Sequence, residues 1–339
     1  MSEGYLPYAT ARATQAEELE AAIARLAPSV ASLATAGLLT GPGPVFVGIG
    51  ASLAAACAPV WSLRSRGVHS WRLGAGDHPL PFPASRHPVF GVSQSGRSSE
   101  TLAVLESVDP SLRHAVVNMT PSPIADIATG VLDIGSVPDS YASTIGYTAT
   151  VAALGMLADA WDGGAPDEGW ARLGALFAAT EKELREQVRA LAPLFATATS
   201  ADFVGAGPAV GSAEASALLF REVVRIPSTG MSTRQYLHGA MESAGGGVHV
   251  VFGDEREHTV ADTLAAAGHP VVLVTSAPPE KRPMLHPVRV PRLPAAQRAV
   301  LEILVAQILV EAVAEVRAVD IEEFVFHNAD IKVTGGPTV

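Results

Sequence analysis

Residues 91–101 read Gly-Val-Ser-Gln-Ser-Gly-Arg-Ser-Ser-Glu-Thr and join two apolar segments. The residues before them, 88–90, predict a buried strand, and residues 102–105 after them predict a helix. At a strand-to-helix junction, free backbone N–H groups and the helix dipole favour an anion. The loop offers an amide and three hydroxyls as further hydrogen-bonding groups, from Gln94, Ser93, Ser95 and Ser98. We therefore predict that this loop binds phosphate.

The kind of phosphate ligand follows from what the loop lacks. It has no lysine before a hydroxyl residue, and no Gly-x-x-x-x-Gly precedes its serines, so a nucleotide-binding P-loop is not expected. A single small phosphomonoester fits better. The alternative is a serine-rich turn in which Ser98 or Ser99 merely caps the following helix.

Composition restricts the class of protein. The chain has 339 residues, of which 48% are hydrophobic, and its formal net charge is −11. The sequence shows no basic patch, so nucleic-acid binding is not expected. The longest apolar run, residues 301–313, contains Glu302, Gln307 and Glu311, so a membrane span is not expected. The N-terminal residues show no secretory signal, and we expect a cytoplasmic protein.

Strand and helix patterns alternate along the first half of the chain. After an N-terminal helical segment, residues 1–38, we expect a first domain over residues 39–164. This alternation predicts an α/β fold with a parallel, doubly wound sheet, in which ligands bind at the carboxyl ends of the strands. The expected strands are 45–47, 71–73, 88–93, 114–119 and 131–134, and the expected helices are 51–66, 98–108 and 143–161.

The second half repeats the pattern of the first. Residues 202–207, Asp-Phe-Val-Gly-Ala-Gly, resemble residues 45–50, Val-Phe-Val-Gly-Ile-Gly, which indicates an internal duplication. The counterpart of the phosphate loop is the acidic segment 253–257, which would repel phosphate. We expect a second domain over residues 165–318 and a tail over residues 319–339. The expected helices are 168–196, 260–267 and 295–316, and the expected strands are 202–205, 248–252 and 270–275.

The order of these motifs resembles the double sugar isomerase (SIS) domain family, including the isomerase half of the glucosamine–fructose-6-phosphate aminotransferases. The resemblance implies two flavodoxin-like αβα halves and assigns phosphate contacts to Ser93, Gln94, Ser95 and Ser98. The family's Gly-Thr-Ser and Val-Ala-Ser-Thr elements match residues 50–52 and 141–144. Ser52 and Ser143 are the further substrate contacts that this match implies.

The same resemblance supplies candidate catalytic residues in the second half and the tail. The family has a catalytic glutamate sixteen residues before a histidine, and Glu222 and His238 keep that spacing. It also places an active-site lysine at Lys332. Glu222 would act as the base, and its apolar surroundings would raise its pKa. His238 would come from a neighbouring subunit as ring-opening acid or base, so a homodimer with shared active sites is implied.

Departures from the family pattern leave the reaction open. The family's lysines before the glutamate and before the histidine are replaced by Leu219 and Leu237, and its proline is replaced by Ala240. One expectation is an isomerase or deaminase of glucosamine 6-phosphate or N-acetylglucosamine 6-phosphate. Alternatives are a dehydratase that eliminates the C3 hydroxyl of the N-acetylated sugar and a sugar-phosphate sensor without catalysis. The histidines lack metal-ligand spacing, and we expect neither a metal nor another cofactor.

Overall fold

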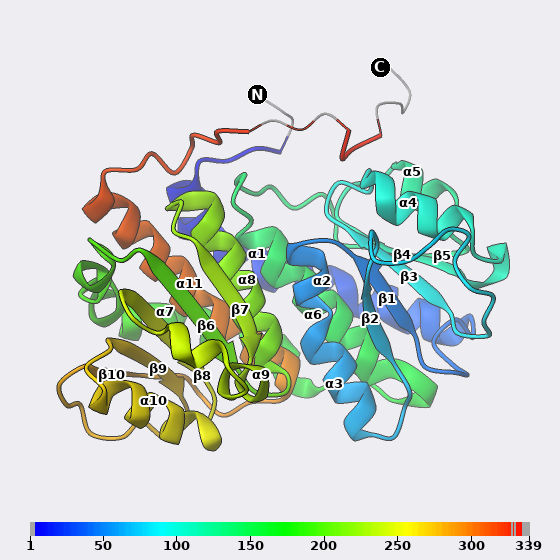
Figure 1. Ribbon diagram of the computed structural model, residues 1–339. Coiled ribbons are helices and arrows are strands. Elements are labelled where there is room, and N and C mark those ends of the chain that lie inside the picture. The colour runs from blue at the N-terminus through cyan, green and yellow to red at the C-terminus, as the bar shows by residue number, and fades with distance from the viewer. Residues whose placement is uncertain (1–3, 327, 329, 334–339) are drawn as a thin grey trace. The chain divides into compact units, whose positions relative to one another are not determined.

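The computed structural model describes residues 4–326, 328 and 330–333 (Figure 1). The chain divides into two compact units, each with its own sheet. Unit 1 comprises Met1–Gly174 and Val325–Val339, and unit 2 comprises Ala175–Phe324.

The sheet of unit 1 has five parallel strands in the order β2-β1-β3-β4-β5. This is the flavodoxin-like order, in which the chain reverses direction across the sheet between β1 and β3. The strands are β1 (Val45–Gly48), β2 (Trp71–Gly74), β3 (Val89–Ser93), β4 (Arg113–Val117) and β5 (Gly130–Asp133). The predicted strands of this half are thus confirmed, with small shifts at their ends.

Helices cover both faces of this sheet, as Figure 1 shows. Val89 packs in a core with residues of α4 and α5, whereas Phe90 lies 6.3 Å from the ring of Trp161 at the end of α6. Successive strand residues face opposite sides, so α4–α5 and α6 form separate layers. The helices are α1 (Tyr8–Thr35), α2 (Ala51–Ala55), α3 (Cys57–Ser65), α4 (Ser99–Glu106), α5 (Pro123–Asp126) and α6 (Ile145–Ala160).

Unit 2 repeats this architecture. Its parallel sheet has the order β10-β9-β8-β6-β7, which is the unit 1 order read from the other edge. The predicted duplication is therefore confirmed at the level of strand order. The elements are α7 (Leu173–Arg189), β6 (Ser200–Gly205), α8 (Ala209–Val223), β7 (Ser228–Ser232), α9 (Thr233–Leu237), β8 (Gly247–Phe252), α10 (Arg256–Ala266), β9 (Val271–Thr275), β10 (Leu285–Arg289) and α11 (Ala295–Arg317).

The differences from the sequence expectation include two edge strands and one long helix. The edge strands β7 and β10 were not predicted, because β7 reads Ser-Thr-Gly-Met-Ser and β10 contains Pro287. Such residues are poor strand formers by themselves and are tolerated at a sheet edge. The expected helix over residues 168–196 is instead α7 flanked by two short 3-10 segments, Glu168–Arg172 and Ala192–Phe195. In the described part of the chain, no helix is both long and apolar enough to span a membrane.

Candidate phosphate-binding and active site

The loop between β3 and α4 has the geometry expected of an anion site. Gly96 has a φ of +62°, and a Cβ at this position would collide with the side chain of Ser122. Only glycine therefore fits the turn. The hydroxyl of buried Ser93 lies 2.9 Å from that of Ser98, so the two side chains form one polar cluster.

The first turn of α4 has no side-chain cap from Ser98. Ser98 stands at the N-cap, but its side chain makes no capping hydrogen bond to the helix. Ser98 is therefore not a simple helix-capping serine. The hydroxyl of Ser99 lies 3.0 Å from both the Glu100 carboxylate and the carbonyl oxygen of Asp330, and it can donate to either. The dipole of α4 therefore favours an anion near a helix start that Ser98 leaves without a side-chain cap.

The position of this loop in the sheet also favours ligand binding. The loop follows β3, and Ser52 lies in the half-buried first turn of α2, just after the neighbouring strand β1. A Cβ at Gly48 would lie 3.1 Å from the Cβ of Ser52 and 3.2 Å from the carbonyl oxygen of Val92. The glycine thus lets Ser52 approach the end of β3. Ligands of such sheets bind at this reversal point, outside the carboxyl ends of the strands.

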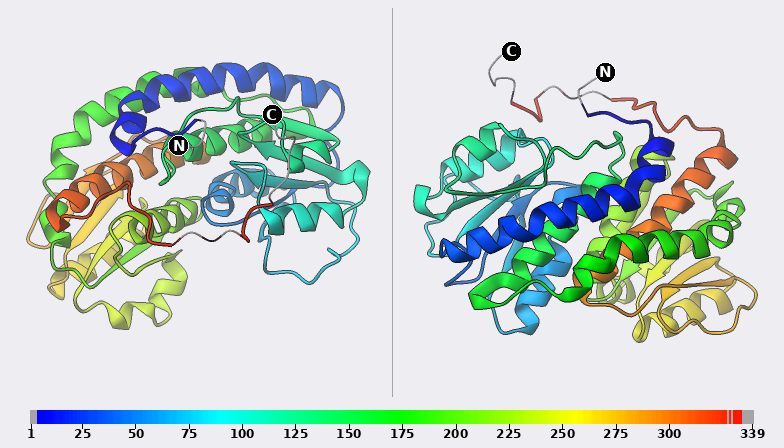
Figure 2. Two further views of the ribbon diagram at one scale, coloured as in Figure 1. Left: turned by 90° about the horizontal axis from the view of Figure 1, so that it is seen from above. Right: turned by 180° about the vertical axis from the view of Figure 1, so that it is seen from behind.

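The C-terminal tail adds Lys332 to the same loop. Lys332 forms an antiparallel bridge with Ser98, and the N–H of Val333 donates to the carbonyl of Arg97 at 3.0 Å. The N–H of Ser99 donates to the carbonyl of Ile331 at 3.2 Å. Figure 2 shows this red segment passing the cyan helix α4. Lys332 is exposed.

A pocket of about 300 Å³ opens beside the loop and collects four of the predicted site residues. Ser52, Ser93 and Ser98 do not line it, although Ser98 touches Lys332 through the backbone bridge. The four predicted residues that line the pocket are Gln94, Ser95, Ser143 and Lys332. Asp139, Asn118, Tyr5 and Tyr141 also line it.

Asp139 organises one side of this pocket and was not predicted from the sequence. Its carboxylate accepts hydrogen bonds from the hydroxyls of Ser143 and Thr144, each at 2.7 Å. It also accepts from the backbone N–H groups of residues 140, 144, 145 and 146. A carboxylate four residues ahead of Ser143 thus caps α6 from a distance and fixes the Ser143 hydroxyl. The acidic residue shortly before a predicted helix was the available signal.

Gln94 and Asn118 hold the opposite side of the pocket to the rest of unit 1. The Gln94 side-chain amide donates to the carbonyl of Gly146 at 2.8 Å and also to the hydroxyl of Thr150. A Cβ at Gly146 would lie 2.6 Å from both Asp139 and Gln94, so glycine permits their approach to α6. Asn118 exchanges two hydrogen bonds with the backbone of Val137, at 2.8 and 2.9 Å. These contacts fix the pocket before any ligand arrives.

In unit 2, Glu222 is a half-buried carboxylate with a raised pKa. It lies half-buried near the C-terminal end of α8. Burial raises its pKa from 4.5 to about 7. A carboxylate with a pKa close to neutrality can accept and return a proton at physiological pH.

His238 lies apart from Glu222 within unit 2. It is exposed at the C-terminal end of α9, whereas Glu222 belongs to α8. Phe220 of α8 packs on Phe203 of β6, whereas Tyr236 of α9 packs in a core with Val204, the next residue of β6. Consecutive strand residues face opposite sides, so α8 and α9 cover opposite faces of the sheet.

Helix α9, which carries His238, is anchored by a buried polar cluster. The hydroxyl of Tyr236 lies 3.0 Å from Nδ1 of His249, and Nε2 of His249 lies 3.2 Å from the carbonyl oxygen of Ala244. Because this carbonyl can only accept, the hydrogen bond requires the proton on Nε2. Burial and the nearby Asp202 raise the pKa of the Tyr236 phenol. The cluster therefore fixes α9 to the strands β6 and β8.

The counterpart of the phosphate loop in unit 2 is occupied by an internal ion pair. Asp254 accepts from the N–H of Ser276 at 2.7 Å and the hydroxyl of Thr275 at 2.8 Å, and it pairs with Arg298. Burial would raise the pKa of Asp254, but these hydrogen bonds outweigh it and hold the pKa low. Arg298 also bonds to buried Glu302 at 2.8 Å. A carboxylate thus stands where the first half carries hydroxyls.

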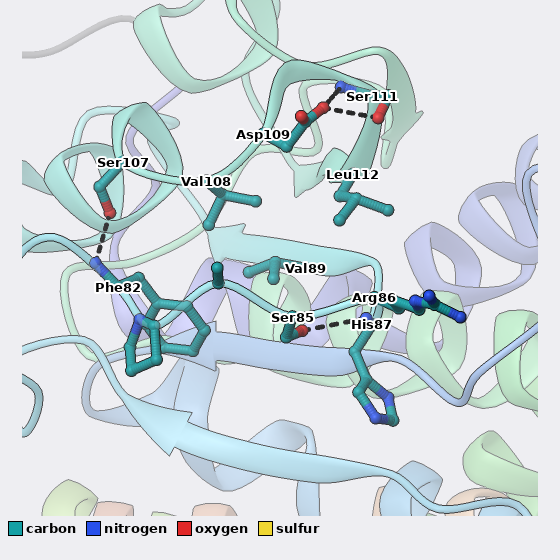
Figure 3. Close-up of a pocket in the computed structure, with 12 residues that line it drawn as sticks. Phe82, Ser85, Arg86, His87, Val89, Ser107, Val108, Asp109, Ser111 and Leu112 are labelled. Atoms are coloured by element: carbon teal, nitrogen blue, oxygen red, sulfur yellow. Dashed lines mark hydrogen bonds between the residues drawn. The ribbon is translucent and has the colours of Figure 1, made fainter.

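A second pocket in unit 1, of about 360 Å³, lies at the amino ends of the strands (Figure 3). It is lined by Val89, the first residue of β3, and by Leu112, which precedes β4. The Ser107 hydroxyl accepts from the N–H of Phe82 at 2.9 Å, and Asp109 accepts from Ser111. These polar groups form hydrogen bonds with one another. Folds of this kind bind ligands at the carboxyl ends of their strands, and this pocket lies at the amino ends.

Comparison with known proteins gives a fold assignment. No protein-family model and no curated protein sequence matches the chain. The C-terminal domain of glucosamine-fructose-6-phosphate aminotransferase from Francisella tularensis superposes with a TM-score of 0.79 at 17% identity, covering 95% of this chain and 99% of that chain. The chain has the double-SIS fold.

Other proteins with this SIS fold differ in the reaction that their names state. Tagatose-6-phosphate ketose/aldose isomerase from Escherichia coli has a TM-score of 0.73 at 15% identity, with 92% of this chain and 95% of that chain covered. Glucosamine-6-phosphate deaminase from Thermotoga maritima has a TM-score of 0.65 at 18% identity, with 88% and 93% covered. At such identities the shared property is the fold, so function must be inferred from the residues of the site.

Proposed function

We propose that this protein is an enzyme that acts on an amino-sugar 6-phosphate by removing a proton at C1 or C2, as a phosphosugar isomerase or deaminase. The observation that supports this most is the pocket beside the β3–α4 loop, where Gln94, Ser95, Ser143 and Lys332 come together. Hydroxyls and an ammonium group in one pocket, beside the loop that leads into α4, suit a phosphate dianion and a sugar hydroxyl.

Each residue has a role in this proposal. The hydroxyls of Ser93, Ser95 and Ser98 hold the phosphate, with Gln94 and Ser52 beside them, and Ser143 contacts the sugar. Lys332 supplies a positive charge at the pocket. Binding energy from the phosphate then fixes the sugar for the reaction, which is how a non-reacting group contributes to catalysis. No metal or other cofactor is required for this chemistry.

The proton transfer is assigned to Glu222 and His238. Glu222 removes the proton next to the carbonyl carbon, and His238 opens the sugar ring by transferring a proton to or from its oxygen. The two side chains lie on helices that cover opposite faces of one sheet. This separation favours a shared site, in which a neighbouring copy of the chain contributes His238.

The proposal therefore describes a cytoplasmic homodimer that binds neither nucleic acid nor membranes. Its phosphate-binding domain is residues 39–164 and its second domain is residues 165–318. The N-terminal helical segment, residues 1–38, precedes them, and the active-site tail is residues 319–339.

Mixing two inactive variants tests the shared site. Glu222→Gln and His238→Asn should each be inactive alone, whereas subunits exchanged between them should recover activity. Half of the randomly mixed dimers are heterodimers, and each has one site with both wild-type residues, so about a quarter of wild-type activity is expected. Activity is measured after denaturing and refolding the mixture. If both residues came from one chain, no mixed dimer would contain an intact site and no activity would return.

Proton exchange tests the proposed reaction itself. Glucosamine 6-phosphate and N-acetylglucosamine 6-phosphate are incubated with the protein in D2O and followed by proton NMR. We expect the H2 signal to disappear, accompanied by a ketose or free ammonia, because the base exchanges the abstracted proton with solvent. New olefinic signals would instead show the dehydratase. Saturable binding without any exchange would overturn the proposal in favour of a sensor.

A further inference from the structure

An aromatic pair forms part of the wall of the pocket. The N-terminal segment pairs with residue 139, because the N–H of Leu6 donates to the Asp139 carbonyl at 2.9 Å and the Asp139 N–H donates to the Gly4 carbonyl at 3.0 Å. This pairing brings the ring of Tyr5 to 4.5 Å from that of Tyr141. Both tyrosines line the pocket, and Tyr141 remains 58% exposed. An exposed ring fixed by a partner is a preformed contact surface for a ligand.

The charges in the pocket decide which ligand group suits this wall. Among its described lining residues, Asp139 is the only carboxylate and Lys332 the only cation. The oxygens of Asp139 already accept from two hydroxyls and four backbone N–H groups. A protonated amine on the sugar would therefore meet Lys332 and no available carboxylate. A tyrosine face also attracts cations, but Lys332 in the same pocket opposes this attraction.

We propose that Tyr5 and Tyr141 receive an uncharged N-acyl group, so that the substrate is an N-acylated amino-sugar 6-phosphate. The planar amide and the methyl group of such a substituent can pack against an aromatic ring. This inference rests on the proposed function and narrows its substrate class. An acylated nitrogen leaves a carbon far less readily than a free amine, so a substrate of this class argues against deamination.

The resemblance places Tyr141 where the family has valine in its Val-Ala-Ser-Thr element, so the ring is a property of this chain. Tyr5 lies far away in the sequence and reaches the pocket only through the pairing with Asp139. Both halves of the aromatic wall can therefore be changed without altering the phosphate loop. Specificity for the nitrogen substituent and affinity for the phosphate become separable quantities.

Binding measurements with three ligands test the inference. N-acetylglucosamine 6-phosphate, glucosamine 6-phosphate and glucose 6-phosphate are titrated calorimetrically into wild type, Tyr141→Ala and Tyr141→Phe. We expect Tyr141→Ala to weaken binding of the acetylated ligand about tenfold and of the other two less than about threefold, because only the acetyl group loses its contact. Tyr141→Phe keeps the ring and should bind all three ligands as wild type does.

Two further variants separate this inference from the proposed function. Ser95→Ala should weaken all three ligands alike, because it alters the phosphate contact. Tyr5→Leu removes the supporting ring and should repeat the selective loss, which provides a second test if Tyr141→Ala folds poorly. Equal losses for all three ligands in both tyrosine variants, or no loss, would overturn the inference and leave the proposed function intact. If none of the three ligands binds to wild type, the proposed function fails and this inference fails with it.

Discussion

Replacing Glu222 by glutamine should lower kcat for proton exchange about 10³-fold while leaving KM nearly unchanged. General base catalysis contributes roughly 10²- to 10⁴-fold, and glutamine keeps the size of glutamate but cannot accept the proton. Because the proposed phosphate contacts lie on other residues, substrate binding should survive. Steady-state kinetics on the sugar phosphate that exchanges in the NMR experiment measures both constants. A matched control is Glu183→Gln, which changes an exposed carboxylate on α7 and should leave both constants as in wild type.

The pH dependence gives this prediction a second measurement. Burial raises the pKa of Glu222 to about 7, and only the deprotonated carboxylate can act as the base. The kcat/KM of wild type should therefore increase with pH and level off above about pH 7. The residual activity of Glu222→Gln should lack this increase. A limb near pH 4.5, or one that persists in the variant, would assign the base to another group.

The raised pKa of Glu222 also makes the stability of the fold depend on pH. Stability should fall as the pH increases, whereas activity should rise. The pKa of Glu222 is higher in the folded protein than the ordinary value of 4.5, so the folded state holds the proton more tightly. The stability that this proton contributes is fully present below pH 4.5 and is lost as the pH increases through about 7. Urea unfolding at pH 5 and pH 8 should show that wild type loses more stability over this interval than Glu222→Gln does.

Local sequence signals predicted most of what positions the phosphate loop. Residues 91–101 combine an apolar strand, a glycine and hydroxyls within one short segment, so their spacing alone indicates a strand, a turn and a helix start. Gly96 indeed has positive φ, and β3 and α4 lie on either side of the turn. The duplication was visible because residues 45–50 and 202–207 share the pattern of a strand followed by a glycine turn. These features depend on neighbours in the chain.

Features that depend on distant residues were not predictable in this way. Asp139 works through hydrogen bonds to the start of α6, and Tyr5 reaches the pocket through a pairing with residue 139. Nothing in the composition around Tyr5 indicates that pairing. The sequence placed Lys332 at the site only by resemblance. In the structure, the backbone bridge to Ser98 is what holds Lys332 beside the β3–α4 loop. The edge strand β7 is polar, and its position is set by α8 and β6 rather than by its own residues.

Replacing Arg298 by leucine should destabilise unit 2 by about 3–5 kcal/mol, because it leaves the buried carboxylate of Glu302 without its charged partner. Arg298 holds two carboxylates, those of Asp254 and Glu302. Burial already raises the pKa of Glu302, whose charge is tolerated because of Arg298 and the Ser212 hydroxyl. Without the guanidinium, both carboxylates lose a charged partner. Chemical denaturation at pH 7 measures the loss, with Arg289→Leu, an exposed arginine at the end of β10, as the control.

The dependence of this loss on pH identifies its cause. In the Arg298→Leu variant, unpaired Glu302 should take up a proton as the pH falls, which relieves the buried charge and stabilises the folded state. In wild type, Arg298 holds the pKa of Asp254 below its ordinary value of 3.8, so the stability that Asp254 contributes stays the same between pH 7 and pH 5. The difference between variant and wild type should therefore shrink from pH 7 to pH 5. The contradicting result would be a small loss of stability, equal to that of Arg289→Leu at both pH values. Thr275 and Ser276 would then be sufficient to hold the loop. The ion pair would not explain why the second half carries a carboxylate where the first half has its proposed phosphate site.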